Sequence, residues 1–297
     1  MIEINNLSFK FGTHQALNEL SVCIPDGSIT ALVGPNGAGK TTLMRCMAAL
    51  AHPGSGQVLI DGIDTTVDPH ACHRLIGFLA DNFGLYEQLT VEQSISYFAV
   101  AHQVDAQRVD EVIKQVNLSN KKQELIKNLS RGMRQRVGIA QAIIHLPKYL
   151  ILDEPASGLD PDARIQLAEL FKDLRQAGIT LLVSSHILAE LDQYATNLIV
   201  LKEGKLVETD FNLQHTSENL IAYFVEANNL YLLENLPEDA PLKQLTIASE
   251  LATFILDDYC APHQALQYLL AMGLQVNAFG KHSINIQDAY LKTIKNA

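Results

Sequence analysis

One stretch of this sequence combines glycines, a lysine and two threonines in an order suited to binding phosphate groups. It runs Gly34-Pro-Asn-Gly-Ala-Gly39-Lys40-Thr41-Thr42. Glycines allow a tight turn in which successive backbone N–H groups face an anion, and the start of a following helix adds the positive end of its dipole. In such a loop the lysine reaches the β- and γ-phosphates, and the next hydroxyl ligates Mg²⁺. The segment therefore predicts a site for a nucleoside triphosphate.

Two adjacent carboxylates, Asp153 and Glu154, follow the apolar segment Tyr149-Leu-Ile-Leu152. Carboxylates are usually solvated surface residues, so the pair alone would also fit an ordinary strand end. Beside a phosphate loop, however, the first can hold Mg²⁺ through a water and the second can polarise the water that attacks the γ-phosphate. We therefore predict a hydrolytic centre with Asp153 at the metal and Glu154 as the catalytic base.

Short apolar runs predict the strands that would present these groups. The predicted strands cover residues 29–33, 149–152 and 180–184. The phosphate loop is predicted to open a helix over residues 42–50. Further turns are predicted at Asp61-Gly62, between short strands, and at Glu203-Gly204, in a hairpin over residues 198–209.

The middle of the chain, over about residues 88–145, is predicted to be mostly helical. Apolar residues at helical spacing cover residues 90–101 and 106–116, and Asp105 is predicted to cap the second helix. Ser130, in Leu129-Ser-Arg-Gly-Met133, is predicted to open another helix that runs to about residue 145. The start of that helix is a second position suited to an anion.

The order of these segments resembles the ATPase subunits of ABC transporters. Along the chain follow the phosphate loop, the Leu-Ser-Arg-Gly-Met segment, the Asp153-Glu154 pair, Ser157-Gly-Leu-Asp160 and Ser185-His186. The resemblance covers about residues 1–210. It implies an α/β fold, the P-loop NTPase fold of ABC type, in which a RecA-like core carries a helical subdomain over about residues 88–145.

The resemblance also implies which residues bind ATP. The phosphate loop contributes Gly34, Pro35, Asn36, Gly37, Ala38, Gly39, Lys40, Thr41 and Thr42. Phe11 occupies the place of an aromatic residue that stacks on adenine, where the family usually has Tyr; stacking needs the ring and not the hydroxyl. His186 matches a histidine that contacts the γ-phosphate and holds the attacking water, and with Glu154 and Lys40 it completes the catalytic set. The simpler alternatives are a core position for Phe11 and a structural role for His186.

A dimer with composite sites is a further implication of the resemblance. In the family, the Ser-Gly helix start of one subunit closes over ATP bound to the phosphate loop of the other. One copy of each motif would then make half of two sites, so we expect a homodimer with two-fold symmetry. The expected contact residues are Ser130, Arg131, Gly132 and Asp160, with Ser130 and Gly132 also touching the nucleotide.

Three positions depart from the commonest family pattern. Arg131 and Met133 replace a glycine and a glutamine of the signature, while Ser130 is kept. Asp81 replaces a glutamine that senses Mg²⁺ and couples to the membrane partner; we expect Asp81 to ligate Mg²⁺ or its water. Similar variants occur in ATPases of drug, lipid and polysaccharide exporters, which the closing segment Asn285-Ile-Gln-Asp-Ala-Tyr-Leu-Lys292 also resembles.

Composition excludes several classes of protein. The formal net charge of −11 argues against a nucleic-acid surface, which needs a basic stripe. Four cysteines without paired spacing indicate reduced thiols, and His70-Ala-Cys-His73 has no further metal ligand nearby. No apolar run approaches the roughly 18–20 residues that span a bilayer, and the N-terminus has no signal-peptide pattern. We expect a cytoplasmic protein on the inner face of the membrane, whose transport pore is formed by other chains.

After about residue 210 the pattern changes. Residues 211–297 contain nine acidic residues, four basic residues and no arginine. They predict a small α+β accessory domain, with extended segments at 220–226 and 255–258 and helices at 262–272 and 286–295. An interaction or dimer-supporting role is favoured over a second enzymatic activity, because no catalytic pattern recurs there.

Together these observations predict an enzyme that binds and hydrolyses ATP with Mg²⁺ and powers transport through integral membrane subunits. An exporter-type ATPase is favoured, and an importer ATPase is a variant of the same interpretation. The alternative is a soluble ABC ATPase that acts on a ribosome, DNA or another assembly. It is disfavoured because this chain lacks fused nucleotide domains, coiled-coil insertions and basic contact surfaces.

Overall fold

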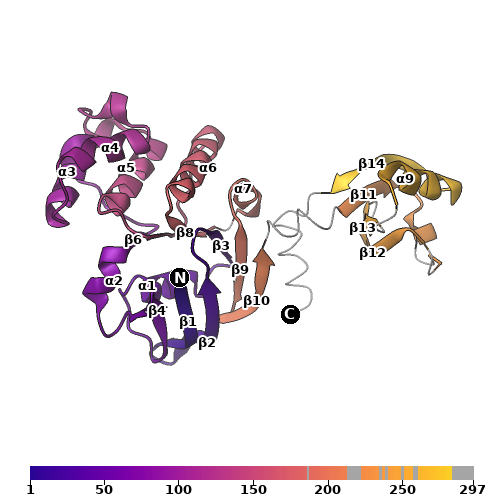
Figure 1. Cartoon of the computed structure of the whole chain (residues 1–297), viewed down its shortest axis with the longest axis horizontal. Coiled ribbons are helices and arrows are strands. Elements are labelled where there is room, and N and C mark those ends of the chain that lie inside the picture. The colour runs from indigo at the N-terminus through magenta and orange to yellow at the C-terminus, as the bar shows by residue number, and fades with distance from the viewer. Residues whose placement is uncertain are drawn as a thin grey trace. The chain divides into compact units, whose positions relative to one another are not determined.

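The computed structural model describes residues 1–185, 187–212, 222–233, 236–237, 240–248, 251–256 and 260–282. The chain divides into two compact units (Figure 1), unit 1 over residues 1–211 and unit 2 beginning at Asn212. His186 and the helix expected over residues 286–295 lie outside the described residues.

A six-stranded sheet forms the centre of unit 1, in the strand order β10-β9-β3-β8-β7-β6. Its strands are β3 (Ile29–Val33), β6 (Ile76–Leu79), β7 (Tyr149–Leu152), β8 (Thr180–Ser184), β9 (Asn197–Lys202) and β10 (Lys205–Asn212). Neighbours from β9 to β6 pair in parallel, and every residue of β3, β7 and β8 is buried, as expected for parallel strands covered on both faces. The strands predicted at residues 29–33, 149–152 and 180–184 are confirmed.

An antiparallel sheet of order β2-β1-β4-β5 makes a second layer of unit 1. Its strands are β1 (Ile2–Phe11), β2 (His14–Ile24), β4 (Ser55–Ile60) and β5 (Ile63–Asp64). Asp61 and Gly62 both have positive φ, at 49° and 79°, and form the predicted two-residue turn. The same geometry recurs at Glu203 and Gly204, between β9 and β10, with φ of 50° and 73°.

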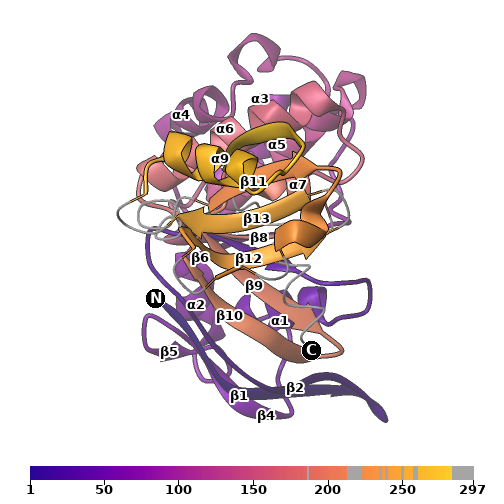
Figure 2. The ribbon, with the colours of Figure 1, turned by 90° about the vertical axis from the view of Figure 1, so that its right-hand side faces the viewer.

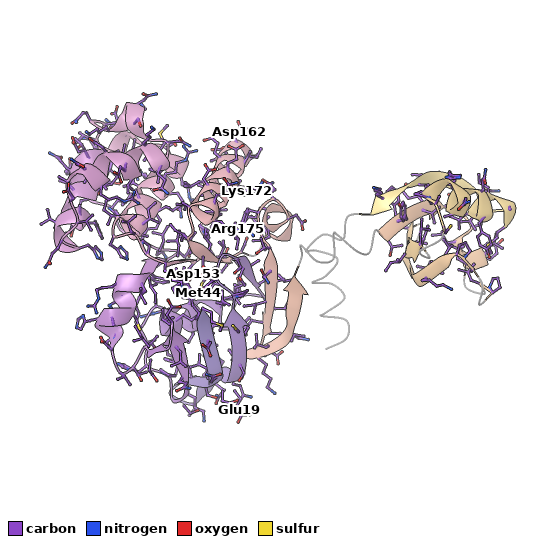
Figure 3. All side chains as sticks on the ribbon, viewed as in Figure 1. Glu19, Met44, Asp153, Asp162, Lys172 and Arg175 are labelled. Carbon is purple, nitrogen blue, oxygen red and sulfur yellow. The ribbon has the colours of Figure 1, made fainter. Side chains whose placement is uncertain are left out.

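Helix α1 (Lys40–Met47) is held by both sheets. Leu43 and Met44 share one buried core with Ile4 and Leu7 of β1 and with Leu32 of β3. Figure 3 shows Met44 inside the body of unit 1, beside the strands. The helix was predicted over residues 42–50. It begins two residues earlier, at Lys40, and ends three residues earlier, at Met47.

Three longer helices gather at one end of unit 1 (Figure 1), as predicted for residues 88–145. They are α3 (Val91–Ala101), α4 (Gln107–Gln115) and α5 (Arg131–Ile143), with short 3₁₀ turns η1 (Ser119–Lys121) and η2 (Ile126–Asn128) between them. The buried amide of Gln141 donates to the Ser94 hydroxyl at 2.9 Å and ties α5 to α3. Asp105 caps the first turn of α4, as predicted, because its carboxylate accepts a 2.8 Å hydrogen bond from the backbone N–H of Gln107. Ala106, between them, already has helical dihedral angles and makes no capping bond.

The remaining helices of unit 1 are α2 (Pro69–Leu75), α6 (Pro161–Gln176) and α7 (Leu188–Leu191). Figure 3 shows α6 with Asp162 near its outer end and Arg175 near the sheet. There Arg175 Nε donates to the carbonyl of Gly27 at 2.6 Å, which anchors the end of α6 beside the start of β3. In the part of the chain that the structure describes, no helix is both long and apolar enough to cross a membrane.

Unit 2 has an antiparallel sheet of order β12-β13-β11-β14, with α9 along one face (Figure 2). Its elements are β11 (Ala222–Ala227), η3 (Leu230–Leu233), β12 (Leu242–Ala248), β13 (Leu251–Leu256), α9 (Pro262–Ala271) and β14 (Val276–His282). Ala265 and Leu269 of α9 pack into a core with Tyr223 and Phe254 of the sheet. The order matches the split βαβ arrangement, with the turn η3 where a first helix usually stands. The sequence predicted α9 and parts of β11 and β13 but neither β12 nor β14.

Candidate functional site

The loop between β3 and α1 is fixed by close packing around its glycines. A Cβ atom on Gly39, whose φ is 103°, would lie 2.6 Å from the carbonyl oxygen of Ala16 and 2.8 Å from Leu17 Cδ2. A Cβ on Gly34 would collide with the carbonyl oxygen of Leu201. Only glycine therefore fits at these two positions. Gly39 is also the N-cap of α1 and provides no side chain, so the first N–H groups of this helix have no capping side chain as an acceptor.

Lys40 is almost completely buried beneath this loop. Its Nζ donates to the carbonyl oxygens of Gly34 at 2.7 Å and Pro35 at 3.3 Å, and lies 4.0 Å from Glu154 Oε1. An ammonium held by carbonyls of the loop itself is positioned before any ligand arrives. The loop therefore combines backbone donors and one fixed positive charge, which suits a polyanion.

Asp153 comes from the end of β7 and meets Thr41 of α1. The Thr41 hydroxyl donates to Asp153 Oδ2 at 2.7 Å, although the two residues are far apart in the sequence. They meet because β3 and β7 both flank β8 and pair with it in parallel, so that their carboxyl ends share one edge of the sheet. The next residue, Glu154, has a positive φ of 48°. This backbone conformation is uncommon for a side chain of that size and is often found at functional sites.

These groups line one cavity of about 360 Å³, within the usual range for small-molecule sites. Its walls are Phe11, His14, Ala16, Asn36, Gly37, Ala38, Gly39, Lys40, Thr41, Thr42, Asp81, Asp153 and Glu154. The Phe11 side chain is 57% exposed, so the alternative that placed it in the core is wrong. Gly34 and Pro35 do not line the cavity; their carbonyls bind Lys40 from the side of the loop.

Oxygen atoms dominate the part of the cavity where a metal would bind. Thr41 and Asp153 touch through side-chain oxygens, and Asp81 is an exposed carboxylate on the same wall. Hard divalent cations such as Mg²⁺ prefer oxygen ligands and usually keep several waters or bind substrate phosphates, so these residues fit such an ion. Among the described residues no cluster of three His, Cys, Asp or Glu side chains could hold a metal alone.

The residues expected at a dimer contact gather elsewhere, and none of them lines the cavity. We call Ser130, Arg131, Gly132 and Asp160 the helix-start patch. Ser130 Oγ caps α5 by accepting the N–H of Met133 at 3.3 Å, and Asp160 Oδ1 caps α6 by accepting the N–H of Ala163 at 2.8 Å. The two helix starts are adjacent, since a Cβ on Gly132 would lie 3.0 Å from the Cβ of Ala163. The side chains of Ser130, Arg131 and Asp160 are exposed.

Three residues of the site were not predicted from the sequence: two line the cavity, and one lies behind it. His14 and Ala16 line it from β2, and His14 pairs with Phe11 across the β1–β2 hairpin. Ser184, fully buried at the end of β8, contacts both Asp153 and Glu154. In the sequence, the feature that could have indicated this role is the position of Ser184 at the end of the strand predicted over residues 180–184.

His186 lies outside the described residues, but its two neighbours are described. Ser185 Oγ donates to Glu190 Oε1 at 2.5 Å and accepts the N–H of Ile187 at 3.0 Å. Burial, together with the nearby charges of Glu190 and Glu154, raises the pKa of Tyr194 well above its usual value. Tyr194 is therefore neutral at physiological pH.

Comparison with known proteins supports one family. The profile described as ABC transporter matches residues 17–157. The chain is 34% identical over 235 residues to the lantibiotic transport ATP-binding protein SrtF of Streptococcus pyogenes, covering 79% of this chain and 99% of that protein. It is 30% identical over 302 residues to the uncharacterized ABC transporter ATP-binding protein YcbN of Bacillus subtilis (strain 168), covering 99% and 97% of the two chains. The second match extends through both units.

A solved structure with a similar fold is the dimeric post-hydrolysis state of an ATP-binding cassette bound to ADP and Pi. It is 26% identical in sequence, with a TM-score of 0.63, and the match covers 71% of this chain and 98% of that chain. The match is to a nucleotide-bound dimer.

Proposed function

Because the chain belongs to the ATP-binding proteins of ABC transporters and is an ATPase of that family, we propose that it powers an exporter-type transporter whose membrane-spanning subunits are separate chains. The observation that carries this proposal is the convergence of Lys40, Thr41, Asp153 and Glu154 on one cavity beside a fixed phosphate loop. This set provides the charge, the metal ligands and the base that hydrolysis of a phosphoanhydride requires.

In the proposed reaction, the loop N–H groups and Lys40 bind the phosphates, and Phe11 stacks on the adenine. Mg²⁺ would be held by Thr41 and Asp153, with Asp81 close by, and when bound it neutralises charge on the β- and γ-phosphate oxygens. Glu154 accepts a proton from the water that attacks the γ-phosphorus. The bond between the γ-phosphorus and the oxygen that bridges it to the β-phosphate breaks, which leaves ADP and inorganic phosphate.

The helix-start patch is proposed to complete the site from a second copy of the chain. Its exposed hydroxyl and its helix N-terminus suit a phosphate, but they do not line the cavity of their own chain. The dimeric, nucleotide-bound relative supports a two-fold homodimer with two composite sites. One chain should then bind ATP alone but hydrolyse it poorly.

The membrane subunit is proposed to dock near residues 81–89 and the neighbouring face of α3. Tyr86 and Tyr97 are 64% and 59% exposed, and their rings meet edge to face at 6.3 Å. Val100 is also exposed on α3. An exposed aromatic and aliphatic cluster favours a protein contact, and its closeness in sequence to Asp81 of the cavity would let nucleotide binding influence that contact.

The proposed placement is the cytoplasmic face of the membrane, without nucleic acid as a partner, in agreement with the net charge of −11. We assign residues 1–210 to the ATPase domain and residues 211–297 to an accessory domain with an interaction role; the two compact units support this division. The export direction rests on Arg131, Met133 and Asp81. The relatives described above are named for transport or transporters, so they give no support to the soluble alternative.

The test is capture of tagged Glu154→Gln from detergent-solubilised cells, with and without Mg-ATP. A polytopic membrane protein that co-purifies at matching stoichiometry would support the transporter subunit. Ribosomes, nucleic acid or soluble proteins alone would overturn it. The matched control is Lys40→Ala, which should not respond to ATP.

A further inference from the structure

One buried hydroxyl joins the two carboxylate residues of the cavity. Ser184 Oγ donates its proton to Asp153 Oδ1 at 2.7 Å and accepts the backbone N–H of Glu154 at 2.8 Å. Ser184 is fully buried, and Asp153 is only 2% exposed. A hydroxyl has one proton to donate, so this pair of contacts uses the donor on one residue and a lone pair on the next.

The fold explains why Ser184 stands there. Strands β7 and β8 pair in parallel with Leu152 opposite Val183, so the residues that follow each of these, Asp153 and Ser184, come side by side at the end of the sheet. On its other side β8 pairs with β3, with Leu32 opposite Ser184. Ser184 is therefore fixed from both neighbouring strands.

The two contacts have different consequences for the carboxylates. The bond to Oδ1 fixes the rotation of the Asp153 carboxylate, so that Oδ2 faces the Thr41 hydroxyl at 2.7 Å. The bond from the Glu154 N–H satisfies a backbone donor at a residue with a positive φ of 48°. Such a conformation persists only when its surroundings determine it.

From these contacts we propose that Ser184 is a positioning residue for hydrolysis, which orients Asp153 toward the metal and holds the Glu154 backbone for attack on the γ-phosphate. This role rests on the proposed function of the cavity. Ser184 itself touches neither nucleotide nor water in that scheme and acts through its two neighbours.

Loss of this fully buried hydroxyl removes one hydrogen-bond partner from the Asp153 carboxylate and one from the Glu154 N–H. Removal of a hydrogen bond to a charged, buried group commonly weakens the arrangement severalfold to about a hundredfold. We expect Ser184→Ala to lower kcat by about tenfold and to raise the Mg²⁺ concentration needed for half-maximal binding of a fluorescent ADP severalfold. Nucleotide affinity without Mg²⁺ should stay within about twofold, because the phosphate loop is untouched.

Thr180, at the opposite end of the same strand, offers a matched control. It is buried, and its hydroxyl accepts the N–H of Gly27 at 2.9 Å. It lies at the start of β8, whereas Ser184 and its contact with Asp153 lie at the end of this strand. Thr180→Val also removes one buried hydroxyl that accepts a backbone N–H, so it should cost stability but leave the Mg²⁺ requirement unchanged. Ser184→Thr keeps the hydroxyl and should recover most of the kcat.

A direct readout of the contact is hydrogen exchange at the Glu154 amide, measured without nucleotide. Exchange there should become faster in Ser184→Ala and not in Thr180→Val. Unchanged exchange, or equal effects of both variants on the Mg²⁺ requirement, would overturn the role of Ser184. A wild-type protein with no ATPase activity would instead overturn the proposed function, which keeps the two failures apart.

Discussion

The cavity and the helix-start patch both present groups suited to phosphate, yet they are built in opposite ways. At the cavity Lys40 and Asp153 are buried and already bonded, Lys40 to the Gly34 carbonyl and Asp153 to the Thr41 hydroxyl. At the patch, Ser130 and Asp160 are exposed and bond only to the first turn of their own helices.

The difference indicates how each region would work. A buried, bonded set costs little reorganisation when the ligand binds, which is the arrangement that gives strong electrostatic stabilisation in a catalytic site. An exposed helix start binds anions weakly until a partner excludes water from it. The cavity is therefore suited to hold nucleotide in one chain, and the patch is suited to act after a second chain closes over it.

The largest effect is expected for Glu154→Gln, which removes the base from the cavity. Hydrolysis should fall by about 10²–10⁴-fold, the usual contribution of general-base catalysis, while ATP binding remains. Because ATP then persists, the variant should form a dimer with Mg-ATP and a monomer without it, as size-exclusion chromatography would show. Normal turnover would remove Glu154 from this role.

Two glycines, one in each region, test how rigid the regions are. Gly39→Ala should destabilise the fold by about 1–3 kcal/mol and abolish nucleotide binding, because its Cβ meets the Ala16 carbonyl at 2.6 Å in a left-handed conformation. Gly132→Ala should change the free energy of unfolding by less than about 1 kcal/mol, because alanine favours a helix and its contact is with one methyl group, that of Ala163. Urea denaturation of both variants gives the comparison, and equal losses would contradict the difference in packing.

Asp81→Gln tests the edge of the cavity nearest the proposed membrane contact. Asp81 is exposed and lines the cavity, so the change should alter binding of the ion only modestly. ATPase activity stimulated by the membrane partner should change severalfold, and more than basal ATPase activity measured without it. Equal changes in the two rates would count against coupling through this position.

The smallest expected effect concerns the far end of α5, the helix that begins at the patch. Just after it, burial and to a lesser extent His102 lower the pKa of His145 to about 4, while Nε2 contacts the Ile76 carbonyl at 3.1 Å. The unfolded chain then binds the proton more readily than the folded one, so stability falls as the pH drops from about 6.5 toward 4. His145 is half-buried, which limits the loss to about 1–2 kcal/mol. Denaturation at pH 7.5 and 5.0 should show a smaller difference for His145→Gln than for the wild type.

Sequence reasoning worked best where a local signal and a functional motif coincided. The buried strands β3, β7 and β8 and the helix start at Ser130 follow from short-range patterns, and the structure confirms them. Asp105 likewise caps the first turn of α4, although α4 itself begins at Gln107, one residue later than predicted.

The rest depended on pairing between distant segments, which one sequence does not reveal. His14 reaches the cavity because it pairs with Phe11 in the β1–β2 hairpin, and Ser184 reaches Asp153 because β8 lies beside β7 in a particular register. The β12 and β14 strands of unit 2 likewise become recognisable through their partners in the sheet. Long-range contacts of this kind also decided which motif residues share the cavity and which form the patch.

The central claim is that one chain supplies the cavity and another supplies the patch, and mixing two defective variants tests it most directly. Lys40→Ala damages the cavity. Ser130→Asp keeps a good N-cap residue on α5 but puts a negative charge where phosphate would bind. Each variant alone should be nearly inactive, whereas an equimolar mixture should recover about a quarter of wild-type ATPase activity, because half of randomly formed dimers then contain one intact site. A mixture no more active than the separate variants, at a concentration where the wild type works, would contradict the account.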